Sequence, residues 1–216
     1  MKEAIVIYGA GGLAREVYNS FIRDYEEYNF LGFIDDNVEV NSEVIDNKKV
    51  IGNKNTLINS LEDVLVIIAI ANPFLRKRIV CELEKSSHIH FPSIVSKKII
   101  NSSFNEIGKG AIVCDGSILT VNVKIKDFAI INPGCFLGHE VVVNEFATIY
   151  PKANISGNTE IGVMSEIGLG SNIIQGLKIG DNSIIGAGAV VVKDIPSNCT
   201  AVGVPAKPIK YHNKEE

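Results

Sequence analysis

The chain has 216 residues, of which 46% are hydrophobic and 21% charged, so its composition excludes a disordered or fibrous protein. Its longest apolar run, from Val64 to Ala71, falls short of the roughly 20 residues that a membrane span needs, and no apolar export signal follows Met1. The formal charge is −4 and no basic patch is visible, so we expect a cytoplasmic protein that binds neither membranes nor nucleic acid.

The first ninety residues alternate between strand and helix signals. Residues 4–8 form an apolar run that ends at Gly9, and residues 13–23 then place apolar side chains at helical intervals. Residues 30–34 and 64–71 predict two further strands, and Pro73 begins a helix that runs to about residue 85. This order predicts a small Rossmann-like α/β domain with a parallel sheet, at residues 1–92.

From about residue 95 a six-residue repeat replaces this pattern. Ile, Val or Leu stands at every sixth position from Ile107 to Val191, fifteen times in succession, and a mostly small residue follows four positions later. Each hexad predicts one short strand whose aliphatic side chain fills a narrow prism, with small residues and turn-formers at the corners. Three hexads close one triangular coil, so we expect five coils stacked about 4.8 Å apart.

This spacing matches the hexapeptide repeat of left-handed parallel β-helices, an all-β fold that is a known exception to the right-handed crossover rule. We place this domain at residues 93–216. Pro205 and Pro208 are expected to end the repeat, because proline cannot join another hydrogen-bonded ladder.

Four motifs in the two domains together resemble those of one protein family. They are Tyr8-Gly9-Ala10-Gly11-Gly12, Gly32-Phe33-Ile34-Asp35-Asp36, Gly138-His139-Glu140 and Val202-Gly203-Val204-Pro205-Ala206-Lys207. The chain resembles, over nearly its whole length, the bacterial sugar O-/N-acyltransferases, which include sialic acid O-acetyltransferases and nucleotide-aminosugar N-acetyltransferases. The resemblance implies transfer of an acetyl group from acetyl-CoA to the amino group of a nucleotide-linked (UDP, dTDP or GDP) amino-dideoxy sugar, for surface-glycan biosynthesis. It also implies a homotrimer with active sites between subunits.

His139 is the candidate general base. Leu137 already fills the core position of its hexad, so His139, two residues later, is expected to project outward from the prism. Acyl transfer from a thioester needs a deprotonated attacker, and imidazole is the side chain best suited to take a proton near neutrality. Glu140 is expected to hold the imidazole tautomer and to stabilise the imidazolium, as the acid of a catalytic triad does.

Three further β-helix residues are candidates for substrate contacts. Gly157 lies 18 positions after His139, one coil later, so its backbone N–H is expected to be accessible to the thioester carbonyl, and the family uses a glycine at the matching place. Asn132 matches a family position near the acceptor group, with a β-helix turn as the equally weighted alternative. Thr148 stands where N-acetyltransferase relatives carry a second histidine that contacts the acyl donor; its hydroxyl can donate a hydrogen bond but cannot act as a base.

The N-terminal domain carries a glycine turn between its first strand and first helix. The N–H groups of Gly9, Gly11 and Gly12 suit a diphosphate at a helix start, although the full dinucleotide-binding spacing is absent. Asp35 and Asp36 follow the second strand and suit hydrogen bonds to a ribose or a base. The resemblance implies that these elements bind the nucleotide sugar.

Other candidates lie in the third loop and at the C-terminus. Asn72 resembles a family residue of the sugar-nucleotide crevice, with capping of the following helix as its alternative role. Lys193 and Lys207, and also Lys210, are candidates for the coenzyme A phosphates, because lysine is a suitable point charge for phosphate.

Three alternative functions use the same fold. O-acetylation of sialic acid is the nearest, because one base serves an amine or a hydroxyl. An inactive nucleotide-sugar-binding or scaffold protein is another, which Thr148 favours and the Gly138-His139-Glu140 motif opposes. A γ-type carbonic anhydrase needs three histidines on a metal, whereas His139 is the one histidine in the coils, so no metal is expected.

Overall fold

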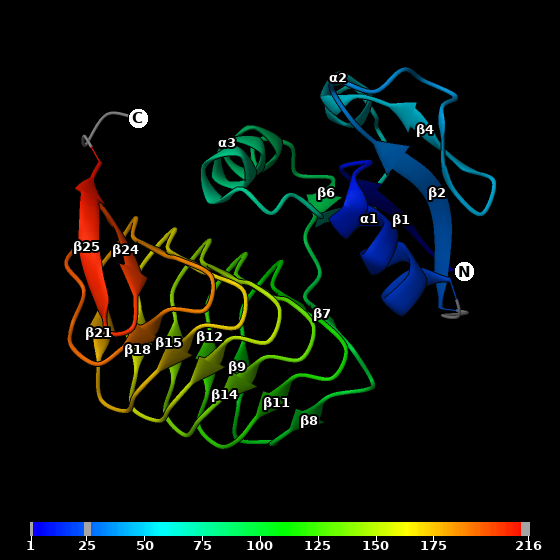
Figure 1. Cartoon of the computed structure of the whole chain (residues 1–216). Coiled ribbons are helices and arrows are strands. Elements are labelled where there is room, and N and C mark those ends of the chain that lie inside the picture. Colours follow the sequence, from blue (N-terminus) through cyan, green and yellow to red (C-terminus); the bar gives the residue numbers. More distant parts are fainter. Residues whose placement is uncertain (1, 24–26, 213–216) are drawn as a thin grey trace. The chain divides into compact units, whose positions relative to one another are not determined.

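The computed structural model describes residues 2–23 and 27–212, which divide into two compact units, Met1–Ile94 and Val95–Glu216 (Figure 1). The division falls two residues after the domain boundary that the sequence suggests. Among the described residues, no helix has the length and apolar character needed to cross a membrane.

The N-terminal unit is built on a six-stranded sheet with the order β3-β4-β2-β1-β5-β6, in which every pairing is parallel except β3 with β4. Its strands are β1 (Glu3–Tyr8), β2 (Tyr28–Ile34), β3 (Glu43–Ile45), β4 (Lys48–Gly52), β5 (Val64–Ile68) and β6 (Ile89–His90). Its helices are α1 (Gly12–Val17), which continues as the π-helical turn η1 (Tyr18–Ile22), α2 (Lys54–Ile58) and α3 (Pro73–Leu83). This parallel sheet and its helices are the α/β domain that the sequence predicts.

The central position of β1 explains its continuous apolar sequence. It pairs with β2 on one side and β5 on the other, and Ile5, Val6 and Ile7 are at most 1% exposed. The strand predicted at residues 64–71 ends at Ile68, and the predicted helix at residues 13–23 divides into α1 and η1. The sequence did not reveal β3, β4, α2 or β6, because these elements are short and lack a clear apolar period.

The C-terminal unit is a left-handed parallel β-helix, as predicted. Seventeen two-residue strands follow one another at six-residue intervals from β7 to β23, and each strand from β7 to β20 pairs with the strand one coil later. They are β7 (Ile94–Val95), β8 (Ile100–Asn101), β9 (Glu106–Ile107), β10 (Ile112–Val113), β11 (Ile118–Leu119), β12 (Lys124–Ile125), β13 (Ile130–Ile131), β14 (Phe136–Leu137), β15 (Val142–Val143), β16 (Thr148–Ile149), β17 (Asn154–Ile155), β18 (Glu160–Ile161), β19 (Glu166–Ile167), β20 (Asn172–Ile173), β21 (Lys178–Ile179), β22 (Ile184–Ile185) and β23 (Val190–Val191).

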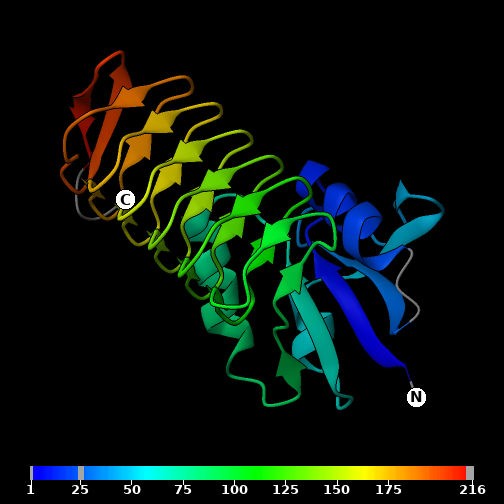
Figure 2. The ribbon, with the colours of Figure 1, turned by 90° about the horizontal axis from the view of Figure 1, so that it is seen from below.

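The register of these strands repeats every 18 residues, as expected for three hexads per coil. Leu119 pairs with Leu137, and Leu137 pairs with Ile155. The solenoid begins two strands earlier than the apolar repeat indicates, because Val95 and Asn101 occupy the first two strand positions and Asn101 interrupts the aliphatic signal. Figure 2 shows the coils lying next to one another from green to orange.

The prism core is apolar at its strands and carries satisfied hydroxyls near its corners. The repeated aliphatic side chain is at most 2% exposed at every hexad from Val113 to Val191. Fully buried Ser117 and Ser165 donate hydrogen bonds to the carbonyl oxygen of the residue fifteen positions later, at 3.1 and 2.7 Å. Because the next coil supplies each acceptor, a small hydroxyl is tolerated inside the prism.

The corners take a left-handed backbone conformation. Fourteen residues at six-residue intervals, from Gly110 to Gly188, have positive φ, and glycine or asparagine occupies nine of these places. Glycine has no Cβ to clash in this conformation and asparagine tolerates it. Glu140, with φ at 54°, is one of the few bulkier corner residues.

The β-helix ends in an antiparallel hairpin, β24 (Cys199–Gly203) and β25 (Ala206–Tyr211). Pro205 lies in its turn, but the prediction that Pro208 ends the ladder is wrong, because Pro208 lies within β25 opposite Ala201. β25 is the outermost strand of its sheet and its register shifts at this point, so a residue without an N–H is accommodated there.

Candidate active site

His139 follows β14 and projects from the prism, as the hexad position predicts. Leu137 is fully buried, whereas the His139 side chain is 53% exposed. Its Nδ1 forms a hydrogen bond with Oε2 of Glu140. Because an ionised carboxylate can only accept, this contact places the proton of the neutral imidazole on Nδ1 and leaves the Nε2 lone pair free to act as a base.

Glu140 has a second hydrogen-bond partner that the sequence analysis missed. Asn122, one coil earlier at the same corner, donates from Nδ2 to Oε1 of Glu140 at 3.4 Å. The hydrogen bond from His139, and then that from Asn122, lowers the pKa of Glu140 below its ordinary value. The signal was present in the sequence, since 18 residues counted back from Glu140 reach Asn122.

Gly157 lies directly against the His139 ring. A Cβ at this position would lie 2.5 Å from both Nε2 and Cε1 of the imidazole, so any residue larger than glycine would displace the ring. No hydrogen-bond partner for the Gly157 N–H is found in the described part of the chain, but the residue is buried beneath the ring. The role of this N–H as a donor to the thioester carbonyl stays a prediction.

The glycine turn of the N-terminal unit joins β1 to α1. Gly9 has φ at 110°, and a Cβ there would lie 2.9 Å from the carbonyl oxygen of Ala69, so the position requires glycine. Around Gly11 and Gly12, in contrast, a Cβ would meet nothing within 4 Å. The turn lies at the carboxyl end of the central strand, where open α/β sheets bind ligands.

Asp35 and Asp36 both have protein partners, which the sequence did not foresee. Asp35 accepts hydrogen bonds from the backbone N–H of Ala10, at 2.9 Å, and of Asn37, at 2.8 Å. Asp36 accepts from the hydroxyl of Tyr8 at 2.7 Å and from the N–H of Lys54 at 2.8 Å. Burial and the contact with Asp36 raise the pKa of Tyr8. Both carboxylates thus stabilise the loops at this edge of the sheet.

Asn72 is the cap of α3. Its side-chain oxygen accepts a hydrogen bond from the N–H of Leu75 at 2.9 Å. Arg76, 1% exposed, donates to the carbonyl oxygens of Ile70 and Ala71 at 2.6 and 2.8 Å and so stabilises the preceding loop. The capping role that the sequence left open is present in the structure.

Comparison with known proteins places the chain in a family. The profile of the PglD N-terminal domain family matches residues 4–83, and no curated protein sequence matches significantly. The acetyltransferase domain of PglB from Neisseria gonorrhoeae FA1090 is 30% identical with a TM-score of 0.90, and the alignment covers 96% of this chain and 100% of that domain. WeeI from Acinetobacter baumannii AYE is 32% identical with a TM-score of 0.85, covering 96% of this chain and 100% of WeeI.

The protein belongs to the bacterial sugar O-/N-acyltransferase family. It is an acetyltransferase, as the resemblance implied. PerB of Caulobacter crescentus, solved with CoA and GDP-perosamine, is 26% identical with a TM-score of 0.86, and the alignment covers 96% of this chain and 97% of PerB.

Two predicted contact residues of this acetyltransferase are buried. Asn132 is 7% exposed, and its Nδ2 donates to the carbonyl oxygen of Ile149 at 2.8 Å, so it acts as a turn residue that joins two coils. Thr148 is fully buried in β16. Neither position favours the predicted contacts with the acceptor and with the acyl donor.

The remaining candidates of the acetyltransferase lie on the surface. Lys193 is exposed after β23, and Lys207 is exposed in β25, where it pairs with Val202. Within the described ranges, no group of three His, Cys, Asp or Glu side chains is arranged to hold a metal ion. The site that the structure brings together is therefore His139, Glu140, Asn122 and Gly157.

Proposed function

We propose that this enzyme transfers the acetyl group of acetyl-CoA to the amino group of a nucleotide-linked amino-dideoxy sugar, with His139 as the general base. The observation that carries the proposal is the imidazole whose Nδ1 is engaged by Glu140 and whose Nε2 is free. The solved relatives support the substrates, since the PglB domain has been solved with acetyl coenzyme A and PerB with CoA and GDP-perosamine.

The reaction follows from this geometry. The amine nitrogen attacks the thioester carbonyl carbon, and Nε2 of His139 accepts the proton that the nitrogen loses. Glu140 stabilises the imidazolium through Nδ1. The tetrahedral intermediate collapses as the C–S bond breaks, and His139 returns the proton to the departing CoA sulfur. The products are the acetamido sugar nucleotide and free CoA.

The nucleotide sugar is proposed to bind at the glycine turn of the N-terminal unit. The open space around Gly11 and Gly12 suits a diphosphate. Asn72 uses its oxygen as a helix cap, which leaves its amide nitrogen for the ligand. Asp35 and Asp36 order this loop and contribute through its shape. Lys193 and Lys207 remain the proposed partners of the CoA phosphates.

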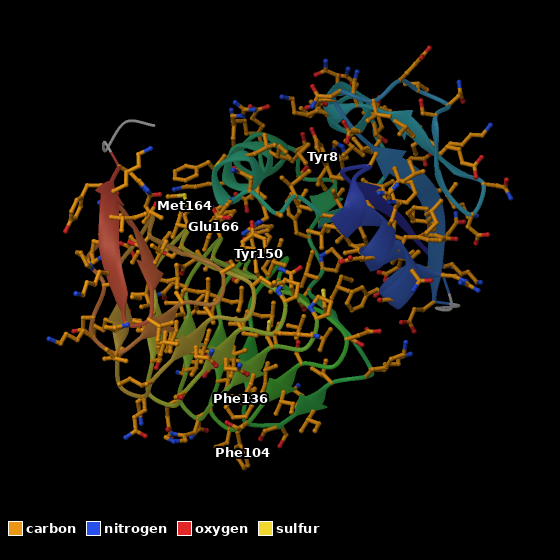
Figure 3. The ribbon with its side chains drawn as sticks, viewed as in Figure 1. Tyr8, Phe104, Phe136, Tyr150, Met164 and Glu166 are labelled. Atoms are coloured by element: carbon orange, nitrogen blue, oxygen red, sulfur yellow. The ribbon has the colours of Figure 1, made fainter. Side chains whose placement is uncertain are left out.

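We also propose that the protein is a homotrimer. An apolar group lies exposed on one side of the β-helix, where Ile100, Ile118 and Phe136 share one column of paired strands. Phe104 and Phe136 project from this side in Figure 3, and Ile100 and Phe104 are 65% and 71% exposed. Exposed apolar side chains on a flat sheet face favour burial against another subunit. Sedimentation equilibrium tests the trimer, and a monomer at micromolar concentration would contradict it.

The test of the activity is CoA release from acetyl-CoA, followed with a thiol reagent. The acceptors are UDP- and dTDP-4-amino-4,6-dideoxyhexoses, GDP-perosamine and sialic acid, free or linked to CMP. We expect release with one aminosugar nucleotide and a loss of about 10²- to 10⁴-fold in His139→Ala. His90→Ala is the matched control, because His90 is also exposed but contacts Asp63 in the N-terminal unit. Release with sialic acid alone would show that the enzyme is an O-acetyltransferase. A His139→Ala variant as active as the wild type would refute the role of His139 as the general base.

A further inference from the structure

A line of hydrogen bonds extends from the catalytic imidazole across two coils. His139 contacts Oε2 of Glu140, and Asn122 contacts the other carboxylate oxygen, Oε1, at 3.4 Å. Each carboxylate oxygen of Glu140 therefore has its own side-chain partner. Nothing in the transfer reaction itself requires the second contact.

The backbone fixes the separation of these residues. Asn122 and Glu140 take the same left-handed corner conformation, with φ at 56° and 54°. The N–H of Glu140 donates to the carbonyl oxygen of Val121 at 3.0 Å, and the strands that follow pair Lys124 with Val142. The Glu140 side chain itself is 47% exposed, so packing restricts its rotamer only in part.

We propose that Asn122 is a positioning residue, whose amide holds the Glu140 carboxylate in the orientation that accepts the hydrogen bond from Nδ1–H of His139. The inference rests on the proposed role of His139 as the general base. Without the amide, the half-exposed carboxylate rotates into solvent, and the imidazole loses the partner that keeps its proton on Nδ1. In the other tautomer Nε2 carries the proton and cannot act as the base.

Asparagine at a left-handed corner has a simpler explanation, which the chain itself can test. Asn158 occupies the same corner one coil after Glu140, with φ at 54°. Its backbone N–H donates to the carbonyl oxygen of His139 at 2.8 Å, but its side chain has no hydrogen bond within the described residues. Asn158 thus shares the backbone requirement of Asn122 and lacks the contact with Glu140.

The experiment compares Asn122→Gly with Asn158→Gly, because glycine keeps the left-handed corner and removes only the amide. The first measurement is the tautomer of His139, from long-range ¹H–¹⁵N spectra at about pH 8.5, where an ordinary imidazole is neutral. The His139 signals are assigned by their absence in His139→Ala. We expect the Nδ1–H tautomer in the wild type and in Asn158→Gly, and a shift toward the Nε2–H tautomer in Asn122→Gly.

The second measurement is turnover with the acceptor that the panel identifies. We expect kcat to fall about tenfold in Asn122→Gly, with an unchanged KM for acetyl-CoA, and to stay at the wild-type value in Asn158→Gly. Asn122→Asp cannot donate and also places a second carboxylate beside Glu140, so it should shift the tautomer at least as far as Asn122→Gly does. An unchanged tautomer in Asn122→Gly would overturn the positioning role. A shifted tautomer with unchanged turnover would confirm the contact and refute His139 as the base.

Discussion

Replacement of Gly157 by alanine tests whether the site depends on the close approach between this glycine and His139. A Cβ at Gly157 would lie 2.5 Å from Nε2 and Cε1 and 2.8 Å from Cδ2 of the imidazole. Carbon atoms in contact are separated by about 3.5–4.0 Å, so the ring must move by about 1 Å. A displacement of this size at a reacting group lowers the rate about 100-fold.

The same substitution should leave the free energy of unfolding almost unchanged. The colliding group is a half-exposed side chain that can rotate away, so we expect an effect within about 0.5 kcal/mol. Gly138→Ala is the contrasting variant, because its Cβ would lie 2.6 Å from the backbone nitrogen of Gly157 in the next coil. There the stacked coils must separate, at a cost of about 1–3 kcal/mol, and Tm should fall by about 2–4 °C per kcal/mol.

The assay is CoA release, run together with thermal unfolding as a double-mutant cycle with His139→Ala. In the His139→Ala background the clash has no partner, so Gly157→Ala should cause no further loss of activity. Full activity in the single Gly157→Ala variant would refute the reasoning. So would a large fall in its Tm, because that would place the clash in the backbone instead of the ring.

Three further predictions concern charge, core packing and thiol chemistry. Glu140→Gln should lower kcat about 10- to 100-fold, because the neutral amide does not stabilise the imidazolium. Since the pKa of Glu140 is lowered, this difference should persist from neutral pH down through the ordinary titration range of glutamate and shrink only below it. Ser165→Ala should destabilise the protein by about 1–3 kcal/mol in urea unfolding, because it removes the 2.7 Å donor to a carbonyl of the next coil; wild-type stability would contradict this role. A thiol reagent at pH 8 should modify exposed Cys81 quickly and buried Cys135 only after unfolding, and rapid labelling of both would refute the burial. Burial raises the pKa of Cys135 from 9.0 to about 11, so its thiol contributes stability below pH 9 that is lost as pH rises toward 11.

The β-helix could be predicted almost completely because its periodicity is local. A residue at the core position of one hexad has the same surroundings as the next, so Leu137 and Ile155 report the same structure independently. The first two strands were missed only because Asn101 interrupts the aliphatic series. The same regularity located Gly157 beside His139, and it would have located Asn122 beside Glu140 had the spacing been counted in the other direction.

Residue roles that depend on a partner elsewhere in the chain were harder to predict. Asp35 and Asp36 have a sequence position typical of nucleotide ligands, yet the structure shows that backbone N–H groups and the Tyr8 hydroxyl already occupy their oxygens. Asn132 and Thr148 have polar side chains suited to substrate contacts, but both are buried. Composition and spacing do not reveal which polar groups form hydrogen bonds within the folded chain or are buried in it.

The sequence by itself determined the two architectures, the family and the outward-facing His139 with its adjacent acid. These features depend on short repeats of two to six residues and on residues adjacent in the chain, both of which can be read directly from the sequence. The tertiary structure alone decided that the imidazole lies directly against Gly157 and that the Asn122 amide donates to Glu140. These contacts join residues about one coil apart and depend on side-chain rotamers, which packing and hydrogen bonding select only after the coils have stacked.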